Sequence, residues 1–248
     1  MSTAKSIKAD YKGYDYEKKF WESGDHEYED LSERAAISKL LPKHMNKFAD
    51  IYGGYGRLAK EYLTRTRRPI IFDLSQKELA AVKERYGEKV EVRAGDIYNM
   101  PFRDGELDGV MLIRVTRYLD NLVDVTNEIY RVLEPGGAAI IEIANKRTIG
   151  KIANFMVGRS KENPFNKSIK QSEKDGIYDY HPKYAEGVFE RAGFKIERVL
   201  SVSNFNNKTL EKVVKTDNLV KMESAVQSAL APIRFASSIY YKLRKPEF

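Results

Sequence analysis

The sequence contains no cysteine among its 248 residues. This absence excludes disulfides, zinc–thiolate sites and cysteine nucleophiles. Only three histidines occur, His26, His44 and His181, and they lie far apart in the chain, so no metal site is expected. The sequence also lacks a run of about 18 apolar residues, and we therefore expect no transmembrane helix and no insertion into a membrane.

The N-terminal segment is charged and has no apolar central stretch, so a secretory signal is not expected and a cytoplasmic protein is predicted. The 43 Lys and Arg residues exceed the 36 Asp and Glu residues, which gives a net charge of +7. Such a balance can attract nucleic acid, anionic lipid or an acidic small substrate. Because the basic residues are scattered among acidic ones, a nucleic-acid partner is possible but not favoured. The oligomeric state cannot be read from the sequence.

Short strand-like and helix-like segments alternate through the first half of the chain. Expected strands cover 47–52, 69–73, 90–94, 108–114 and 138–144, and expected helices cover 56–65, 75–87 and 121–133. Alternation of this kind predicts an α/β fold, in which a parallel, doubly wound sheet carries helices on both faces.

The flanking segments are expected to complete a single domain. Residues 1–46 form an N-terminal helical cover, with helices over 15–22 and 27–41, and Pro42 ends the second. Residues 47–145 form the cofactor-binding core. Residues 146–181 lose the regular pattern and are interpreted as an insertion or cap. Residues 182–248 complete the sheet, with a helix over 182–194, a strand over 195–203, a helical insertion over 209–230 and a last strand over 234–244.

The stretch DIYGGYG, residues 50–56, closes the first expected strand with a short glycine-rich loop. Gly54 and Gly56 allow a tight turn and leave space for a ligand against the backbone. Together with Ala59 they also satisfy the dinucleotide pattern G-x-G-x-x-A, which is weak when taken alone. The prediction of a nicotinamide oxidoreductase would have only that pattern in its favour. The negative charge of Asp50 argues against it, because it would repel the pyrophosphate of a dinucleotide.

Three aspartates lie at the ends of three successive expected strands: Asp50 within the end of the first, Asp73 as the last residue of the second, and Asp96 just after the third. Asp50 suits a cationic amino group, and Asp73, with two oxygens, can accept hydrogen bonds from both hydroxyls of a ribose. Asp96 can accept a hydrogen bond from an exocyclic adenine amine, with Ile97 on the face of the ring. An amino-acid head, a ribose and an adenine without phosphate describe S-adenosylmethionine.

Five motifs in order resemble the class I S-adenosylmethionine-dependent methyltransferases, especially the small-molecule ubiquinone/menaquinone-biosynthesis type (type 11). They are DIYGGYGRLA, IIFDLSQKEL, GDIYNMPFRDGELDGV, LIRVTRYLDN and EIYRVLEPGGAAIIEI. The resemblance covers about 48–145 firmly and 182–202 more loosely. It implies a Rossmann-like sheet of seven mainly parallel strands with an antiparallel last strand, S-adenosyl-L-methionine as cofactor, and transfer of its methyl group (EC 2.1.1.-) to an unidentified small-molecule acceptor.

The resemblance also implies which residues form the site. The cofactor-binding set comprises Asp50, Tyr52, Gly53, Gly54, Gly56, Asp73, Leu74, Asp96, Ile97 and Arg114. The acceptor pocket is expected to include Tyr14, Trp21, Arg117, Tyr118 and His181. Within the insertion, the side chains expected to line that pocket or to fill a small satellite core are Phe155, Met156, Phe165, Tyr178 and Tyr180. No catalytic residue is identified, because the cofactor carries the activation and a general base is not always needed.

Tyr52 departs from the small-molecule branch, which has glycine at this place. The DNA cytosine methyltransferases resemble the sequence in carrying an aromatic residue there, so an aromatic ring is compatible with the cofactor. Two alternatives stay open. The acceptor could be RNA or a protein, or the chain could be a non-catalytic binding protein on a degenerate methyltransferase fold.

Overall fold

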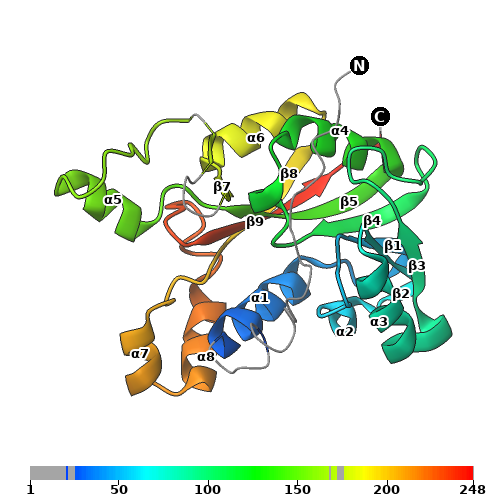
Figure 1. The fold of residues 1–248 in the computed structure, drawn as a ribbon, viewed down its shortest axis with the longest axis horizontal. Coiled ribbons are helices and arrows are strands. Elements are labelled where there is room, and N and C mark those ends of the chain that lie inside the picture. Colours follow the sequence, from blue (N-terminus) through cyan, green and yellow to red (C-terminus); the bar gives the residue numbers. More distant parts are fainter. Residues whose placement is uncertain (1–20, 22–25, 168, 172–175, 248) are drawn as a thin grey trace.

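A seven-stranded sheet forms the centre of the molecule, with strand order β3-β2-β1-β4-β5-β9-β8 (Figure 1). The computed structural model describes residues 21, 26–167, 169–171 and 176–247. The strands of this sheet are β1 (Met45–Ile51), β2 (Thr66–Asp73), β3 (Glu91–Ala94), β4 (Leu107–Leu112), β5 (Leu133–Ala144), β8 (Lys195–Val202) and β9 (Ser238–Arg244). The first five pair in parallel, and β9 runs antiparallel to both of its neighbours. This confirms the predicted mainly parallel sheet with an antiparallel last strand.

Helices cover both faces of the sheet, as predicted (Figure 1). One face carries α4 (Leu122–Val132) and α6 (Pro182–Arg191), and the other carries α1 (Glu27–Leu40), α2 (Ala59–Tyr62), α3 (Gln76–Tyr86) and α8 (Thr216–Val226). Two helices, α5 (Ile149–Met156) and α7 (Lys208–Val213), project away from these layers. Short 3-10 turns lie at Gly87–Lys89 and Thr116–Tyr118. None of the helices in the described ranges is long and apolar enough to cross a membrane.

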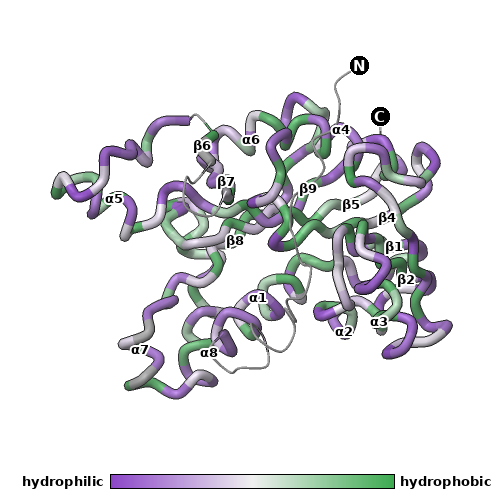
Figure 2. Tube along the Cα trace, in the orientation of Figure 1, coloured by the Kyte–Doolittle hydropathy of each residue, from purple (hydrophilic) through white to green (hydrophobic). Residues whose placement is uncertain are grey.

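Two hydrophobic cores form because each central strand is buried on both faces. Successive strand side chains point to opposite faces, so Ile70 and Phe72 pack with α4 and α6, whereas Ile71 packs with α1, α2 and α3. Figure 2 shows the resulting band of hydrophobic residues along the strands, with hydrophilic residues over the loops.

The local signals in the sequence place several element ends correctly. Ser75 caps α3, because its hydroxyl accepts a hydrogen bond from the amide of Glu78 at 3.3 Å. Gly87 ends this helix with a φ of 56°, a conformation that favours glycine. The helix predicted over 27–41 is α1, which ends at Leu40, before Pro42.

Two predicted helices differ from the structure. The helix expected over 56–65 is reduced to α2, because residues 53–58 are used for the turn after β1. The helix expected over 209–230 is broken into α7 and α8, since Val214 and Lys215 have extended ψ angles of 131° and 139°. The break lets Glu223 of α8 turn inward, where it is fully buried against Tyr28 of α1.

The segment expected to be an irregular insertion contains regular elements. It holds α5 and a two-stranded ribbon of β6 (Lys170–Gln171) and β7 (Tyr178–Asp179). Tyr180 packs in the main core, while Met156 is largely exposed, so the expected satellite core does not include these two side chains. The helix predicted over 15–22 lies, apart from Trp21, outside the described residues.

Candidate functional site

The glycine loop turns directly over the end of β1. Its backbone takes positive φ values at Tyr52 (56°), Gly54 (55°) and Gly56 (80°). A Cβ atom on Gly53 would lie only 2.6 Å from the carboxyl carbon of Asp50, so the backbone of the loop rests on that carboxyl group. Only glycine allows so close an approach. The loop is thereby held beside the first of the three aspartates.

Asp73 ties the end of β2 to this loop. One carboxylate oxygen accepts a hydrogen bond from the amide of Gly54 at 2.9 Å, and the other accepts one from the amide of Ser75 at 2.8 Å. Burial raises the pKa of Asp73, against the lowering effect of these backbone donors. Each oxygen keeps a further lone pair for a ligand. The next side chain, Leu74, is 47% exposed although it is apolar.

Tyr52 reaches across to the turn that follows β3. Its hydroxyl accepts a hydrogen bond from the amide of Ile97 at 3.3 Å, and its ring lies 5.8 Å from that of Phe72. Burial, with the nearby charges of Asp96 and Asp73, raises the pKa of Tyr52 to about 12. The phenol therefore lies near both carboxylates and accepts a hydrogen bond from a backbone amide that a ligand could use.

Asp50 is the most deeply placed of the three aspartates, with 2% of its surface exposed. The hydroxyl of Tyr62 donates a hydrogen bond to it at 3.2 Å. Burial raises the pKa of Asp50 to about 7, and the charge of Asp73 adds to this, while Tyr62 and Arg57 oppose it. A cation that approached Asp50 would therefore stabilise an otherwise costly charge.

Arg114, expected at the cofactor, belongs to an ion-pair network that sequence patterns did not indicate. The fully enclosed carboxylate of Glu33 accepts hydrogen bonds from Arg57 and from Arg114, both at 2.7 Å. Burial alone would raise the pKa of Glu33, but the two guanidinium groups outweigh it and hold the pKa at about 2. Trp21 stacks on the same pair, with its ring 3.8 Å from Arg57 and 5.0 Å from Arg114. The network joins α1 to the ends of β1 and β4.

A second buried acid, Glu142 of β5, orients the turn that contains Arg117 and Tyr118. Its carboxylate accepts hydrogen bonds from the amide of Arg114 at 3.0 Å and from the hydroxyl of Ser238 at 2.8 Å. A guanidinium nitrogen of Arg117 lies 3.5 Å from the same group. Part of the charge of Arg117 is thus already paired within the protein, which weakens its expected role toward an acidic acceptor.

His181 caps α6, and the structure gives it this structural role. Its Nδ1 accepts a hydrogen bond from the amide of Lys183 at 3.2 Å. Burial, with nearby cationic side chains, lowers the pKa of His181 to about 4, too low for an effective base near pH 7. Tyr14 lies outside the described residues. Across those residues, no group of three His, Asp or Glu side chains could hold a metal ion.

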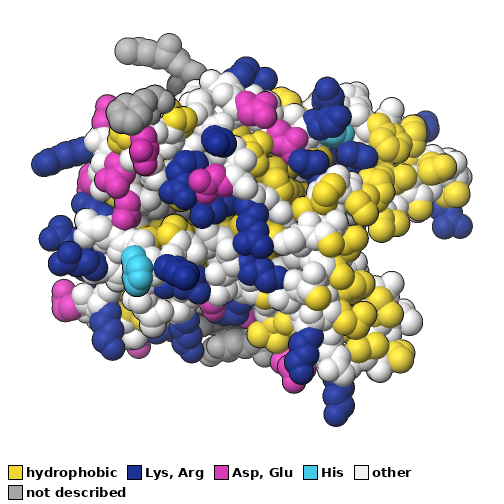
Figure 3. All heavy atoms as spheres, turned by 180° about the vertical axis from the view of Figure 1, so that it is seen from behind, with side chains coloured by type: hydrophobic (Ala, Val, Ile, Leu, Met, Phe, Trp, Pro, Cys, Tyr) yellow, Lys and Arg dark blue, Asp and Glu magenta, His cyan; other side chains and the backbone are white. Residues whose placement is uncertain are grey.

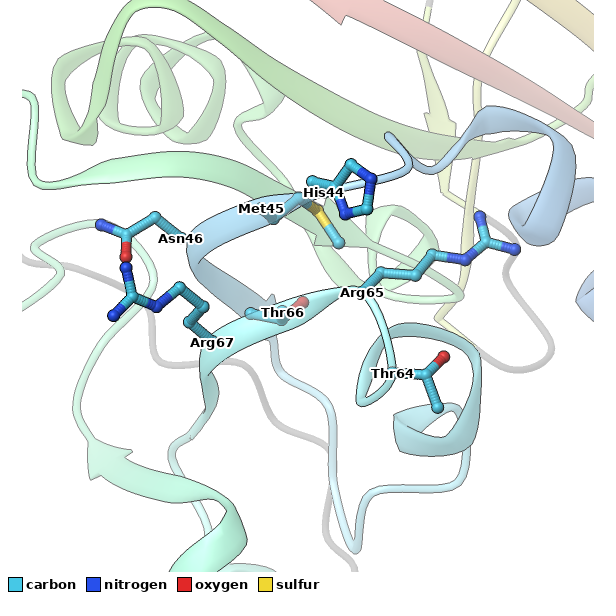
Figure 4. Close-up of a pocket in the computed structure, with 7 residues that line it drawn as sticks. All are labelled: His44, Met45, Asn46, Thr64, Arg65, Thr66 and Arg67. Atoms are coloured by element: carbon cyan, nitrogen blue, oxygen red, sulfur yellow. The ribbon is translucent and has the colours of Figure 1, made fainter.

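The pocket in Figure 4 lies at the opposite end of the parallel strands. It has a volume of about 400 Å³ and is lined by residues that precede or begin β1 and β2. These residues are His44, Met45, Asn46, Thr64, Arg65, Thr66 and Arg67. Asp50 and Asp73 lie at the other ends of the same two strands, and the glycine loop follows β1 there. In open α/β sheets, ligands bind at that carboxyl edge, where the strand order reverses, here between β1 and β4.

Comparisons with known proteins show similar sequences and a similar fold. Residues 49–141 match the family described as a methyltransferase domain. A probable S-adenosylmethionine-dependent methyltransferase of Mycolicibacterium smegmatis is 28% identical over 166 residues, which cover 66% of this chain and 57% of that protein. A ubiquinone/menaquinone biosynthesis C-methyltransferase of Dinoroseobacter shibae is 29% identical over 114 residues, 43% of this chain and 46% of that protein. The chain thus spans about half the length of these curated relatives.

A solved structure shares the fold across most of the chain. It is an S-adenosylmethionine-dependent methyltransferase from Thermotoga maritima, described as a possible histamine N-methyltransferase, with a TM-score of 0.62, 18% identity and coverage of 89% of this chain and 91% of that one. Residues 49–141 match a methyltransferase domain, and the ordered motifs and the shared fold support a class I S-adenosylmethionine-dependent methyltransferase.

Proposed function

We propose that the protein binds S-adenosylmethionine at the carboxyl edge of β1, β2 and β3 and transfers its methyl group to a small molecule. One observation carries this proposal: Asp50 and Asp73 contact one glycine loop at the carboxyl ends of β1 and β2, and Asp96, which follows the adjacent β3, lies near Tyr52 of that loop. Carboxylates without a phosphate-binding group suit a cationic, phosphate-free adenosyl ligand.

Each acidic group has a distinct role in this proposal. Asp73 accepts hydrogen bonds from the ribose hydroxyls with the lone pairs that Gly54 and Ser75 leave free. Asp96 and the amide of Ile97 bind the adenine edge. The side chain of Ile97, expected on the face of the ring, is fully buried in the core, so the exposed side chain of Leu74 is proposed to cover that face instead. Asp50 attracts the amino group from beneath the loop.

In this proposal the protein acts mainly by positioning the acceptor and the cofactor, and less by supplying reactive side chains. The bound cofactor supplies an activated methyl group, and the protein must align acceptor, methyl carbon and sulfur and exclude water. Trp21, Arg117 and Tyr118 are proposed to border the acceptor, since they lie in or beside the segments that join α1 to the ends of β1 and β4. We assign no general base.

A small acceptor is supported by the relative named as a ubiquinone/menaquinone biosynthesis C-methyltransferase. The alternative of an RNA or protein acceptor rests on the basic charge alone. The alternative of a non-catalytic protein rests on Tyr52, whose hydroxyl accepts the hydrogen bond from the amide of Ile97. The adenine and the phenol compete for this donor, so the ring must shift or share it on binding.

Calorimetric titration with S-adenosylhomocysteine tests the proposed function. We expect the wild type to bind, and Tyr52→Phe to bind about fivefold more tightly, because a net hydrogen bond contributes about 1 kcal/mol and the variant frees the Ile97 amide. Absence of binding by the wild type and both Tyr52→Phe and Tyr52→Gly would overturn the proposal. Binding by Tyr52→Gly alone would favour the non-catalytic alternative.

The affinity for S-adenosylhomocysteine should also depend on pH through Asp50. With a pKa of about 7, Asp50 is protonated below neutral pH, and only its charged form attracts the ligand's amino group. Affinity should therefore rise with pH up to about 7 and then level off, with a loss of about thirtyfold at about pH 5.5 relative to pH 8. Asp50→Asn should bind weakly and lose this dependence. An unchanged pH profile in Asp50→Asn would remove Asp50 from the proposed site.

A further inference from the structure

The exposed apolar side chains gather on two segments that flank one end of the molecule. We call residues 146–167, with α5, the first arm, and residues 207–234, with α7 and α8, the second arm. Of ten exposed large hydrophobic side chains in the described ranges, the arms contain eight: Ile149, Met156, Val157, Phe165, Leu210, Val213, Met222 and Ile233. Figure 3 shows hydrophobic side chains over both projecting lobes and along the hollow between them. Such a concentration marks an interaction surface.

The same two arms carry the excess positive charge. The first arm contains six Lys and Arg residues and one acidic residue. The second arm contains five Lys and Arg residues and three acidic residues. Their formal charges are therefore +5 and +2, which together equal the net charge of +7 of the whole chain. The remaining sequence is balanced, with 32 basic and 32 acidic residues. Lys146 is buried, and Lys151 and Arg234 pair with acids outside the arms. The exposed cations beside the apolar side chains are Arg159, Lys161, Lys167, Lys215 and Lys221.

Within the arms, apolar and basic side chains alternate at short range. α5 buries none of its residues, and the exposed Met156 and Val157 are followed by the exposed Arg159 and Lys161. In the second arm, Val213 is 80% exposed and is followed by the exposed Lys215. Side chains of this kind adsorb to a bilayer surface, because the apolar groups enter the acyl boundary and the cations reach lipid phosphates.

Other occupants fit this composition less well. RNA-binding surfaces stack bases on aromatic rings, whereas seven of the eight apolar side chains are aliphatic and only Phe165 is aromatic. Stable protein interfaces are depleted of lysine in their cores, whereas lysine borders the apolar positions here. The mixture of aliphatic and cationic groups therefore favours a lipid surface.

We propose that the two arms dock the protein on a bilayer that contains anionic lipids, with no segment crossing it. The arms leave the sheet at one edge, since α5 follows the carboxyl end of β5 and α7 follows that of β8, which runs in the same direction (Figure 1). The aspartates lie at this edge too. Docking would bring the proposed site near the bilayer, where an acceptor dissolved in lipid could reach it. The docking itself does not rest on the proposed methyl transfer.

Vesicle co-sedimentation tests this proposal. We expect the wild type to bind vesicles of phosphatidylcholine and phosphatidylglycerol in equal parts, and to bind pure phosphatidylcholine at least about tenfold more weakly, because several basic residues of the arms are attracted to an anionic surface. Two variants, Met156→Asp with Val157→Asp in the first arm and Val213→Asp in the second, should each weaken binding to the anionic vesicles at least about tenfold.

Matched controls separate docking from misfolding. Val123→Asp places the same change on an exposed apolar residue of α4, outside the arms and in a first helical turn, where acids are tolerated. Lys161→Glu with Lys167→Glu should weaken vesicle binding, whereas Lys89→Glu should not. All variants should retain the wild-type thermal transition and the wild-type response to S-adenosylhomocysteine, whatever that response is.

Four outcomes would overturn the proposal. They are no binding of the wild type to anionic vesicles, an equal loss in Val123→Asp and the arm variants, binding to RNA but not vesicles, and self-association of the wild type that the arm variants abolish. The last would assign the arms to contact between copies of the chain. Because vesicle binding is measured without cofactor, failure of docking and failure of the proposed methyl transfer are distinguishable.

Discussion

Replacing Asp73 by asparagine should weaken the binding of S-adenosylhomocysteine by about 100-fold or more, because two hydrogen bonds to a charged group contribute about 1.5–3 kcal/mol each. Both carboxylate oxygens already accept backbone hydrogen bonds, from Gly54 and Ser75. An amide at this position has only one oxygen, so its nitrogen must face one of these donors. The variant would thus lose the ribose contacts and also loosen the glycine loop. Calorimetric titration measures the affinity, and urea denaturation measures the change in stability.

Asp108→Asn provides a matched control for this prediction. Asp108 also accepts two backbone hydrogen bonds, from the amides of Asn46 and Lys47 at 2.5 and 3.0 Å, but at the amino end of β1. Its replacement should lower stability by a similar amount and leave the affinity for the ligand unchanged. A similar loss of affinity in both variants would show that the effect of Asp73→Asn is general destabilisation, not loss of a ligand contact.

Replacing Glu33 by glutamine should lower the free energy of unfolding by about 3 kcal/mol, because it removes the fully buried carboxylate that pairs with both Arg57 and Arg114. The two guanidinium groups are then left with their partly exposed partners Asp30 and Glu29, and glutamine fills a similar volume without the charge. Urea denaturation at neutral pH measures this loss. The tertiary contacts of Trp21, which stacks on the same arginines, should loosen with it.

The contribution of Glu33 should also depend on pH. Its pKa in the folded protein, about 2, lies below the ordinary value of 4.5, so its stabilising effect is present above about 4.5 and is lost as the pH falls toward 2. The difference between wild type and Glu33→Gln should therefore shrink in acid. Glu197→Gln serves as control, because Glu197 pairs with Arg244 at a partly exposed site and should cost at most about 1 kcal/mol. Equal losses in the two variants would contradict the importance of the buried network.

The fold was predictable where local signals and alternation agree. Ser75 and Gly87 delimit α3, and the apolar runs before Asp50 and Asp73 become buried parallel strands. The break between α7 and α8 was not predictable, because neither glycine nor proline marks it. It depends on Glu223, which is drawn inward by Tyr28, 195 residues away in the sequence.

The residues of the candidate site also fall into two groups, those predictable from local sequence and those that depend on distant partners. Glycines and aspartates at strand ends can be read from motifs, since their roles depend on local backbone geometry. Glu33 and Glu142 were missed because their partners are distant in sequence. In α1, Glu33 is one of several acidic residues, and nothing in the local sequence marks it as the buried one. For Tyr52, the departure from glycine was visible, but its reach to Ile97 depends on the spacing of β1 and β3 across β2.

The position of β9 has a consequence for how the chain is made. This strand comes last in the described sequence, yet it lies inside the sheet, between β5 and β8. Until residues 238–244 have left the ribosome, β5 of the nascent chain is therefore an edge strand whose backbone groups have no partner strand on that side. Chaperones and aggregating partners could bind this edge for as long as translation of the C-terminal segment takes. Slow codons in that segment would therefore increase the risk of aggregation more than slow codons after β3.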